Sequence, residues 1–434
     1  MFKAPRGMKD ILPAEQHYWK YVCDEATQIS RLYGYERIDT PALEYTGLFL
    51  RSVGEETDIV EKQMYTFEDR GGDSVTLRPE GTAPVCRAYI EHGLHNLPQP
   101  IRLCYFGSIF RYERPQAGRL RQHQQFGCEA IGSADPLLDA EMVDMAWRLC
   151  TLLGLKDLTV QLNSIGCQVC RSRYVQQLRT YYSSYADLPC PDCRKRLQHN
   201  PLRLLDCKNP PCQEIAIKAP RIWESLCDEC RRHFDSLKDY LARLQIPYEL
   251  NPHLVRGLDY YNRTVFEIQA MDTGGQNALG GGGRYDGLIE LLGGKPAPAV
   301  GFAMGIERII LNLQKQSMQP PARNTARVFL AYVGEDAKRA ALTLADDLRQ
   351  AEIGVVVAVD GRSLKAQLKQ ANSLGLPQAV IIGQDEIQSR SVTVRDMARG
   401  EQASIPAEQL VSQLKAQSAS GGIAGTNSTY GTGS

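Results

Sequence analysis

The chain lacks an excess of charge of either sign, because its 434 residues hold 50 Lys and Arg against 50 Asp and Glu. This balance argues against a protein held on nucleic acid by bulk charge, although it leaves room for a local basic patch. No apolar run approaches about 18 residues, so no membrane span is predicted. The N-terminal segment MFKAPRGMKDILPAE is charged where a signal peptide needs an apolar run. These absences predict a soluble, cytoplasmic protein with no membrane partner.

The length exceeds that of one ordinary domain, and 43% of the residues are hydrophobic, which is enough to bury real cores. Thirteen cysteines in a long chain without a signal peptide are expected to be thiols or metal ligands, and not disulfides.

The first three quarters of the chain contain both predicted strands and predicted helices, without strict alternation. Strand composition, rich in Val, Ile, Phe and Tyr, marks residues 74–78, 101–112, 124–131, 159–163, 264–269 and 299–302. Long helices are predicted over residues 14–33, 82–93, 138–153 and 305–315. Consecutive strands with helices grouped around them predict an α+β domain on an antiparallel sheet.

A cysteine-rich insertion, residues 164–250, interrupts this domain and holds eight of the thirteen cysteines. It contains the predicted helices 172–182 and 219–240. The domain is therefore expected in two parts, residues 1–163 and 251–318.

The segment QSMQPPARN, residues 316–324, is typical of a linker. Beyond it, residues 325–416 alternate strictly between strand and helix, which predicts a compact α/β domain with a mixed sheet. Its predicted strands are residues 327–333, 354–359, 378–382 and 391–395, and its predicted helices are 335–350, 364–374 and 406–416. The small, polar residues 417–434 predict a disordered tail.

Three short segments contain residue types that are typical of binding or catalytic sites. The first, YFGSIFRYERPQAGRLRQHQQFGCE (residues 105–129), predicts a hairpin whose arginines suit phosphate recognition, since a guanidinium matches phosphate oxygens and keeps its charge. The alternative is a charged hairpin in solvent. The second, LVRGLDYYNRTVFE (residues 254–267), predicts a polar pocket with tyrosine walls, or otherwise a surface turn with partly buried tyrosines.

The third segment is the run ALGGGGRYDGL, residues 278–288. Four successive glycines permit unusual dihedral angles or let a ligand approach the main chain. The spacing matches neither a P-loop nor a dinucleotide fingerprint. Nearby, GFAMGIERIIL (residues 301–311) places Arg308 early in a helix that follows a strand, a usual place for a nucleotide, although such an arginine is also a common ion-pair partner.

Together these segments resemble those of the bacterial-type histidyl-tRNA synthetases. TLRPEGTA (residues 76–83) resembles the segment after motif 1, FRYERPQAGRLRQHQQFGCE resembles motif 2, and GFAMGIERI resembles motif 3. LVRGLDYYNRTVFE and GGGGRYDGL resemble the two histidine signatures. The resemblance extends from Arg6 to about Lys415, with all five motifs in the expected order.

The resemblance implies a class II aminoacyl-tRNA synthetase with an antiparallel catalytic sheet, a C-terminal anticodon-binding domain and an obligate homodimer. It implies ATP with Mg²⁺, L-histidine and histidine tRNA as substrates. According to the resemblance, Arg111 and Arg256 are the catalytic residues, and both contact the α-phosphate of ATP. It assigns the remaining ATP contacts to Arg308, Arg119 and Glu113. The histidine contacts that it implies are Glu80, Thr82 and Gln125 for the ammonium, Glu129 and Tyr261 for the imidazole, Tyr260 beside them, and Tyr285 near the amino end.

Two alternatives stay open at this point. One is a catalytically silent synthetase paralogue that serves as a regulatory subunit in histidine biosynthesis; such chains lack the C-terminal domain. The other is a zinc-dependent nucleic-acid module built on the cysteines, which leaves the five motifs unexplained.

The cysteine spacing itself predicts structural zinc in the insertion. Three CxxC pairs provide thiolates, and two such pairs complete a four-thiolate site. They are Cys167 and Cys170, Cys190 and Cys193, and Cys227 and Cys230, with Cys207 and Cys212 as a wider fourth pair. The resemblance weighs against zinc, since these synthetases do not generally need it. The alternative is small, partly buried thiols.

Overall fold

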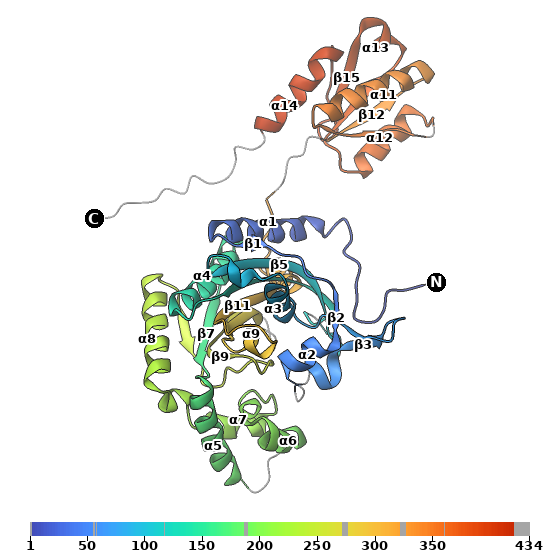
Figure 1. Cartoon of the computed structure of the whole chain (residues 1–434). Helices are drawn as coiled ribbons and strands as arrows, with labels where there is room; N and C mark the ends of the chain where they lie inside the picture. Colours follow the sequence, from blue (N-terminus) through green and yellow to red (C-terminus); the bar gives the residue numbers. More distant parts are fainter. Residues whose placement is uncertain are drawn as a thin grey trace, which may run out of the picture. The chain divides into compact units, whose positions relative to one another are not determined.

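The computed structural model describes residues 2–54, 57, 59–116, 118–185, 190–270, 277–321, 327–359 and 361–420. The chain divides into two compact units, Met1–Pro320 and Pro321–Ser434, and the division falls in the predicted linker. Figure 1 labels the helices and strands of each unit. Within the described residues, we find no helix that is long and apolar enough to cross a bilayer.

The first unit is built on an eight-stranded sheet in the order β1-β5-β6-β11-β10-β9-β7-β8. Its six central strands pair antiparallel, as the sequence predicts, and the short edge strands β1 and β8 pair parallel to their neighbours. In sheet order the bounds are Glu36–Arg37, Ile101–Phe110, Gln122–Ile131, Ala299–Gly305, Ala278–Arg284, Asn262–Ala270, Leu158–Ser164 and Tyr248–Leu250.

Four helices cover one face of this sheet and bury the larger core against it. They are α1 (Gln16–Leu32), α4 (Pro136–Leu152), α8 (Asp228–Arg243) and α10 (Ile306–Lys315). The opposite face packs against α3 (Thr82–Glu91), α9 (Leu288–Leu291) and part of the insertion.

The sequence of β6 shows how the sheet separates these two faces. Phe126, Cys128 and Ala130 point into the four-helix core, whereas Glu129 and Ile131 point to the opposite side. Successive side chains of a strand alternate between faces, so Gln125 lies on the same side as Glu129. The predicted site residues Gln125 and Glu129 are thus on the face away from the four-helix layer.

Strand β10 was not predicted as a strand, since four glycines carry no side-chain pattern. It pairs with β9 and β11 in the middle of the sheet, with a shift of register at each end. The glycines allow this close pairing; a Cβ on Gly282, for example, would lie 2.0 Å from the carbonyl oxygen of Gly301.

A small sheet and the insertion complete the first unit. The small sheet has the order β2-β4-β3, with bounds Leu43–Tyr45, Ser74–Leu77 and Tyr65–Glu68, and α2 (Thr46–Val53) lies beside it. The insertion contains α5 (Gln168–Ser183), α6 (Pro191–His199) and α7 (Pro210–Ile217).

The insertion differs from the prediction in two respects. The helix predicted over residues 219–240 begins only at Asp228, after a short 3-10 turn, Ile222–Ser225. Helix α8 and strand β8 fall within the predicted insertion, but α8 packs against the main core and β8 pairs with the main sheet.

The second unit is an α/β sandwich with a mixed sheet, as predicted. The order β13-β12-β14-β15-β16 has three parallel strands followed by two antiparallel ones, with bounds Gly354–Val357, Arg327–Tyr332, Gln378–Ile382, Ser391–Asp396 and Gln402–Pro406. Its helices are α11 (Glu335–Gln350), α12 (Leu364–Ser373), α13 (Gln384–Ser389) and α14 (Leu410–Ser420).

Four features of the second unit differ from the prediction. Strand β16 and helix α13 were not predicted, and residues 406–409, expected to begin the last helix, end β16 and form a 3-10 turn. Helix α14 continues to Ser420, past the predicted start of the tail at residue 417. The rest of the predicted tail lies outside the described residues.

Candidate active site

Glu80 lies between β4 and α3 and caps the N-terminus of that helix. Its Oε2 accepts a hydrogen bond from the backbone N–H of Thr82 (2.6 Å) and its Oε1 from that of Ala83 (2.7 Å). Burial raises the pKa of Glu80, while these two donors and Arg111 act in the opposite direction. Oε1 keeps a lone pair that is free to accept from a bound cation.

Glu129 projects from β6 and is fully buried. The Thr82 hydroxyl donates to its Oε1 (2.7 Å), and the Tyr285 hydroxyl donates to its Oε2 (2.5 Å). Burial raises the pKa of Glu129 to about 8, although both hydroxyls favour the ionised form. Gly301, its partner on β11, leaves the necessary space, because a Cβ there would lie 1.7 Å from Oε2.

Three tyrosines form one wall beside these carboxylates. The ring centroid of Tyr260 lies 4.7 Å from that of Tyr261 and 5.7 Å from that of Tyr285. The Tyr260 hydroxyl donates to Glu80 Oε2 (3.4 Å). Tyr260 and Tyr261 are only 8% and 7% exposed, so the alternative of a surface turn is wrong.

Two arginines lie next to this wall. The Nε of Arg111, at the end of the motif 2 strand, donates to the carbonyl oxygen of Pro79 (2.7 Å), next to Glu80. Arg256 Nη1 donates to Glu267 Oε1 (2.7 Å), and its guanidinium lies 5.8 Å from the Tyr261 ring centroid. The Nε of Arg256 is buried without a hydrogen-bond partner among the described residues, which is costly unless a ligand accepts from it.

Glycine in β10 provides the space that Arg256 occupies. A Cβ on Gly281 would lie 3.0 Å from Arg256 Nη1 and 2.4 Å from the carbonyl oxygen of Phe266. The run of glycines therefore brings the main chain close to a guanidinium as well as to the neighbouring strands.

Arg308, in the first turns of α10, holds the hairpin loop against β10. Its Nε donates to the carbonyl oxygen of Gly118 (3.0 Å) and its Nη1 to that of Ala278 (2.7 Å). In the same loop, Arg119 Nε lies 2.8 Å from Glu113 Oε2. The arginine of the third motif is therefore bonded to backbone carbonyls, and the alternative of an ion-pair partner is not what the described residues show.

The charges of these arginines act on one another. Burial lowers the pKa of Arg111, and the positive charge of Arg256 lowers it further, against the effect of Glu113, Glu80 and Tyr260. Burial likewise lowers the pKa of Arg308, and Arg119 and Arg111 add to that effect. Guanidinium groups stay charged at these shifts. Cations brought together in this way are stabilised when an anion binds between them.

Sequence reasoning missed two residues of the site. Tyr105, on β5, is buried, and its hydroxyl has no partner within the described part of the chain, although Glu129 and Glu80 are near enough to raise its pKa. Glu267 pairs with Arg256, although the sequence motif around it assigns it no role. The available signal for Tyr105 is its position on the hairpin. Tyr105 pairs with Gly127, two residues before Glu129, so the alternation of side chains puts Tyr105 and Glu129 on the same face of the sheet.

The predicted zinc ligands lie in the insertion. They form two groups of four cysteines, one with Cys167, Cys170, Cys227 and Cys230 and the other with Cys190, Cys193, Cys207 and Cys212.

An antiparallel sheet that places one arginine on its central hairpin and another on the helix after its last strand defines the catalytic unit of a class II aminoacyl-tRNA synthetase. The family profile described as histidyl-tRNA synthetase matches residues 7–169 and 215–309. A second profile, described as an anticodon binding domain, matches residues 327–417. The chain belongs to the histidyl-tRNA synthetase family.

Relatives extend this likeness over nearly the whole chain. The histidine–tRNA ligase of Dehalococcoides mccartyi is 56% identical over 417 residues, covering 96% of this chain and 100% of the relative. That of Halothermothrix orenii is 49% identical over 413 residues, covering 95% and 99%. The apo structure of Staphylococcus aureus histidyl-tRNA synthetase superposes with a TM-score of 0.81 at 38% identity, covering 96% and 100%. The regulatory-subunit alternative, defined by the loss of the C-terminal domain, does not describe this chain.

Proposed function

We propose that this protein is an ATP-dependent histidine–tRNA ligase, which activates L-histidine and transfers it to the 3′ end of histidine tRNA. The observation that supports this most directly is a pair of buried carboxylates: Glu129 is hydrogen-bonded by Thr82 and Tyr285, and Glu80 is near enough to Arg111 to oppose the effect of burial, which lowers the pKa of that guanidinium. This arrangement supports a polar site for one amino acid beside a site for a polyphosphate.

Activation joins two anions. A carboxylate oxygen of histidine attacks the α-phosphorus of ATP, a new P–O bond forms, and the bond to the β-phosphate breaks to release pyrophosphate. In our proposal Arg111 and Arg256 neutralise the α-phosphate, and Arg256 has a buried N–H free for this purpose. Arg308 binds the γ-phosphate with N–H groups that its backbone contacts leave unused.

The remaining ATP contacts come from the hairpin loop. We assign Arg119 to a further contact with ATP and Glu113 to the adenine, with the ion pair between them holding both in place. ATP enters as its magnesium complex, and Mg²⁺ is part of that substrate.

Histidine is selected by hydrogen bonds at both of its ends. Glu80, Thr82 and Gln125 hold the ammonium group, and Glu80 has a free lone pair for it. Glu129 accepts from one imidazole N–H and Tyr261 fixes the far edge of the ring. Tyr260 and Tyr285 orient the carboxylates that they contact. An amino acid without the imidazole N–H leaves Glu129 unpaired, which discriminates strongly.

Transfer completes the reaction. The terminal ribose hydroxyl of the tRNA attacks the carbonyl of the histidyl-adenylate, loses its proton, and AMP departs. We assign anticodon contacts to residues 325–416, in the second unit. We place the enzyme in the cytoplasm, with its tRNA.

We also propose that the enzyme acts as a homodimer. Leu43, Tyr45 and Phe67 are exposed apolar side chains on the small sheet β2-β4-β3, which adjoins the motif 1 segment. Apolar side chains gathered on one exposed sheet are typical of a surface that a partner covers.

Separating the two units tests this division of labour. A chain ending at Pro320, the boundary between the compact units, is expected to keep histidine-dependent ATP–pyrophosphate exchange if it stays dimeric. Its charging of histidine tRNA is expected to fall at least about a hundredfold, because anticodon contacts are lost. Both activities are measured on the same preparation, with its mass in solution as the control. Full charging by the truncated dimer would contradict an anticodon role for residues 325–416.

A further inference from the structure

The eight cysteines of the insertion form two separate clusters. The stem cluster consists of Cys167, Cys170, Cys227 and Cys230, and the lobe cluster consists of Cys190, Cys193, Cys207 and Cys212. Within each cluster the four Sγ atoms all lie within 4.8 Å of one another. All thirteen cysteines of the chain are free, so no sulfur of either cluster is used in a disulfide.

We propose that each cluster binds one zinc ion through four thiolates. A tetrahedral ZnS₄ site has Zn–S bonds of about 2.3 Å, which places its sulfurs about 3.8 Å apart. The Sγ atoms of Cys167 and Cys170 are 3.6 Å apart, close to that spacing. Binding releases the thiol protons to solvent. Because four protein ligands leave no position for water, both ions are structural and take no part in the reaction.

Three of these cysteines lie at the N-termini of helices. Cys167, Cys190 and Cys227 are the N-cap residues of α5, α6 and α8. In the stem cluster the backbone N–H of Cys227 donates to Cys170 Sγ (3.0 Å), and that of Cys167 donates to Cys230 Sγ (3.3 Å). Backbone donors and helix dipoles both favour negative charge. A zinc ion with four thiolates carries a net charge of −2, and the backbone is arranged to accommodate it.

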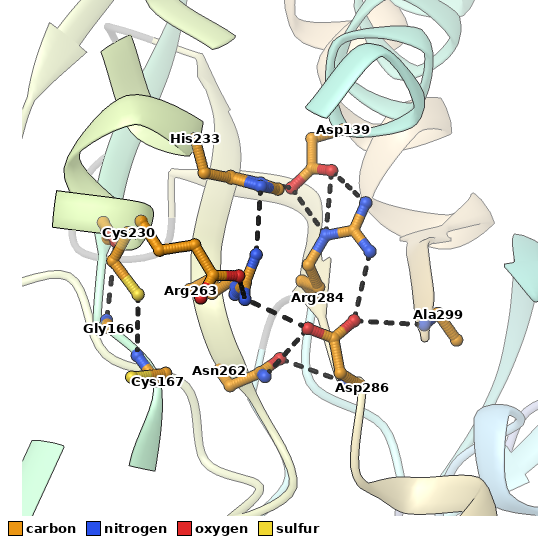
Figure 2. A network of polar contacts seen from close by, with 12 residues as sticks. Asp139, Gly166, Cys167, Cys230, His233, Asn262, Arg263, Arg284, Asp286 and Ala299 are labelled. Atoms are coloured by element: carbon orange, nitrogen blue, oxygen red, sulfur yellow. Dashed lines mark hydrogen bonds and ion pairs between the residues drawn. The ribbon is translucent and has the colours of Figure 1, made fainter. Parts of the chain in front are cut away.

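The stem cluster lies next to a network of hydrogen bonds and ion pairs, which Figure 2 shows. The backbone N–H of Arg263 donates to the carbonyl oxygen of Gly166 (2.8 Å), and its side chain pairs with Glu229 (2.5 Å) on α8. His233, one turn further along α8, lies 3.1 Å from Asp139 on α4, which also pairs with the buried Arg284. The ends of α5 and α8 are therefore held in place by contacts other than the sulfurs themselves.

The lobe cluster closes a short segment, the lobe (residues 190–212), in which Leu202, Leu204 and Leu205 are buried but regular secondary structure is sparse. Residues 190–212 contain two short helices, α6 and the beginning of α7, and a 3-10 turn. Segments of this size usually need a metal or disulfides to stay folded. The family profile leaves residues 170–214 unmatched, so this lobe is not part of what the profile describes.

Residues next to both clusters hydrogen-bond to the segment LVRGLDYYNRTVFE, residues 254–267. Arg171, directly after Cys170, donates to the carbonyl oxygens of Asp259 (3.1 Å) and Tyr261 (3.3 Å). Asn200, in the lobe, donates to Asp259 Oδ1 (3.0 Å). If Tyr261 contacts the imidazole, as the proposed function holds, the two zinc ions help to fix the position of Tyr261 through Arg171, Asn200 and Asp259.

Metal analysis of the full chain, purified without chelator, tests the zinc proposal. We expect two zinc ions per chain, falling to one in Cys190→Ser/Cys193→Ser and staying at two in the control Cys23→Ser, which alters a cysteine outside both clusters. Fewer than about one zinc per ten wild-type chains, or iron in its place, would overturn the proposal whether or not the variants fold.

The link to the histidine pocket has a separate readout. Removing zinc with a chelator and a thiol reagent is expected to raise the KM for histidine in exchange about tenfold, leave the KM for ATP within about twofold, and be reversed by added zinc. An unchanged KM for histidine would contradict the link while the metal count still supports the sites. Zinc-loaded protein without any exchange would instead contradict the proposed function.

Discussion

Arg256→Ala is expected to lower histidine-dependent ATP–pyrophosphate exchange by a factor of about 100 to 1,000, which corresponds to about 3–4 kcal/mol of lost transition-state stabilisation. The physical reason is that negative charge develops as the carboxylate attacks the phosphate, and the substitution removes a fixed cation that stabilises this charge. Arg256 is held for that role by Glu267 and by the space above Gly281. Initial rates at saturating histidine and ATP measure the effect.

The substitution also leaves Glu267 without its partner, so two controls are needed. Combining it with Glu267→Gln removes the stranded carboxylate, and we expect exchange to stay low. Arg102→Ala removes an arginine of the same sheet that pairs with Glu141, and exchange is expected to stay within about twofold of wild type. A loss of less than about tenfold in Arg256→Ala would mean that Arg256 does not contact the phosphate.

Glu129→Gln is expected to weaken histidine binding about 10- to 100-fold, because a hydrogen bond to a charged group contributes about 1.5–3 kcal/mol. The amide keeps the shape of the side chain but loses the charge that orients the imidazole. ATP affinity is expected to change less than about twofold. Calorimetry with each ligand separately measures both, and Glu249→Gln, on the exposed edge strand β8, is the matched control. Equal losses for both ligands would assign Glu129 to the fold instead of the ring.

The raised pKa of Glu129 adds a pH dependence with a definite sign. With a pKa of about 8, most of the free pocket holds the neutral acid at pH 7, whereas the ionised form accepts the imidazole N–H. Histidine affinity is therefore expected to rise about five- to tenfold between pH 7 and pH 8.5 and to level off above the pKa. The same dependence in Glu129→Gln would show that another group titrates.

Much of the fold could be predicted from the sequence because most strands carry apolar side chains in partial alternation. Strand β6 is an example, with one face toward the four helices and the other carrying the predicted site residues. Strand β10 has glycine where the pattern should be, so its place in the sheet depends on close backbone approach that periodicity does not report. Helix α13 has six residues and none of them is buried, so it offers no apolar spacing to detect.

The residues of the candidate site were predicted from the resemblance of their motifs to a known family more than from the spacing of apolar and polar residues. That resemblance named Glu80, Glu129 and Arg256, but it did not indicate that the hydroxyls of Thr82 and Tyr285 share one carboxylate. Tyr105 was missed because a tyrosine in a strand is an ordinary core residue until its partners are known. The grouping of the cysteines also needed coordinates, since the stem cluster joins pairs that flank the whole lobe cluster in sequence.

The central claim is that the pocket around Glu129 selects histidine for activation by ATP. Pyrophosphate exchange with each of the standard amino acids, supplied one at a time to the full chain, tests it most directly. We expect exchange with histidine and less than about one part in a thousand of that rate with any other, since amino acids that cannot pair with Glu129 leave it desolvated. Comparable exchange with a second amino acid, or none with histidine, would contradict the account.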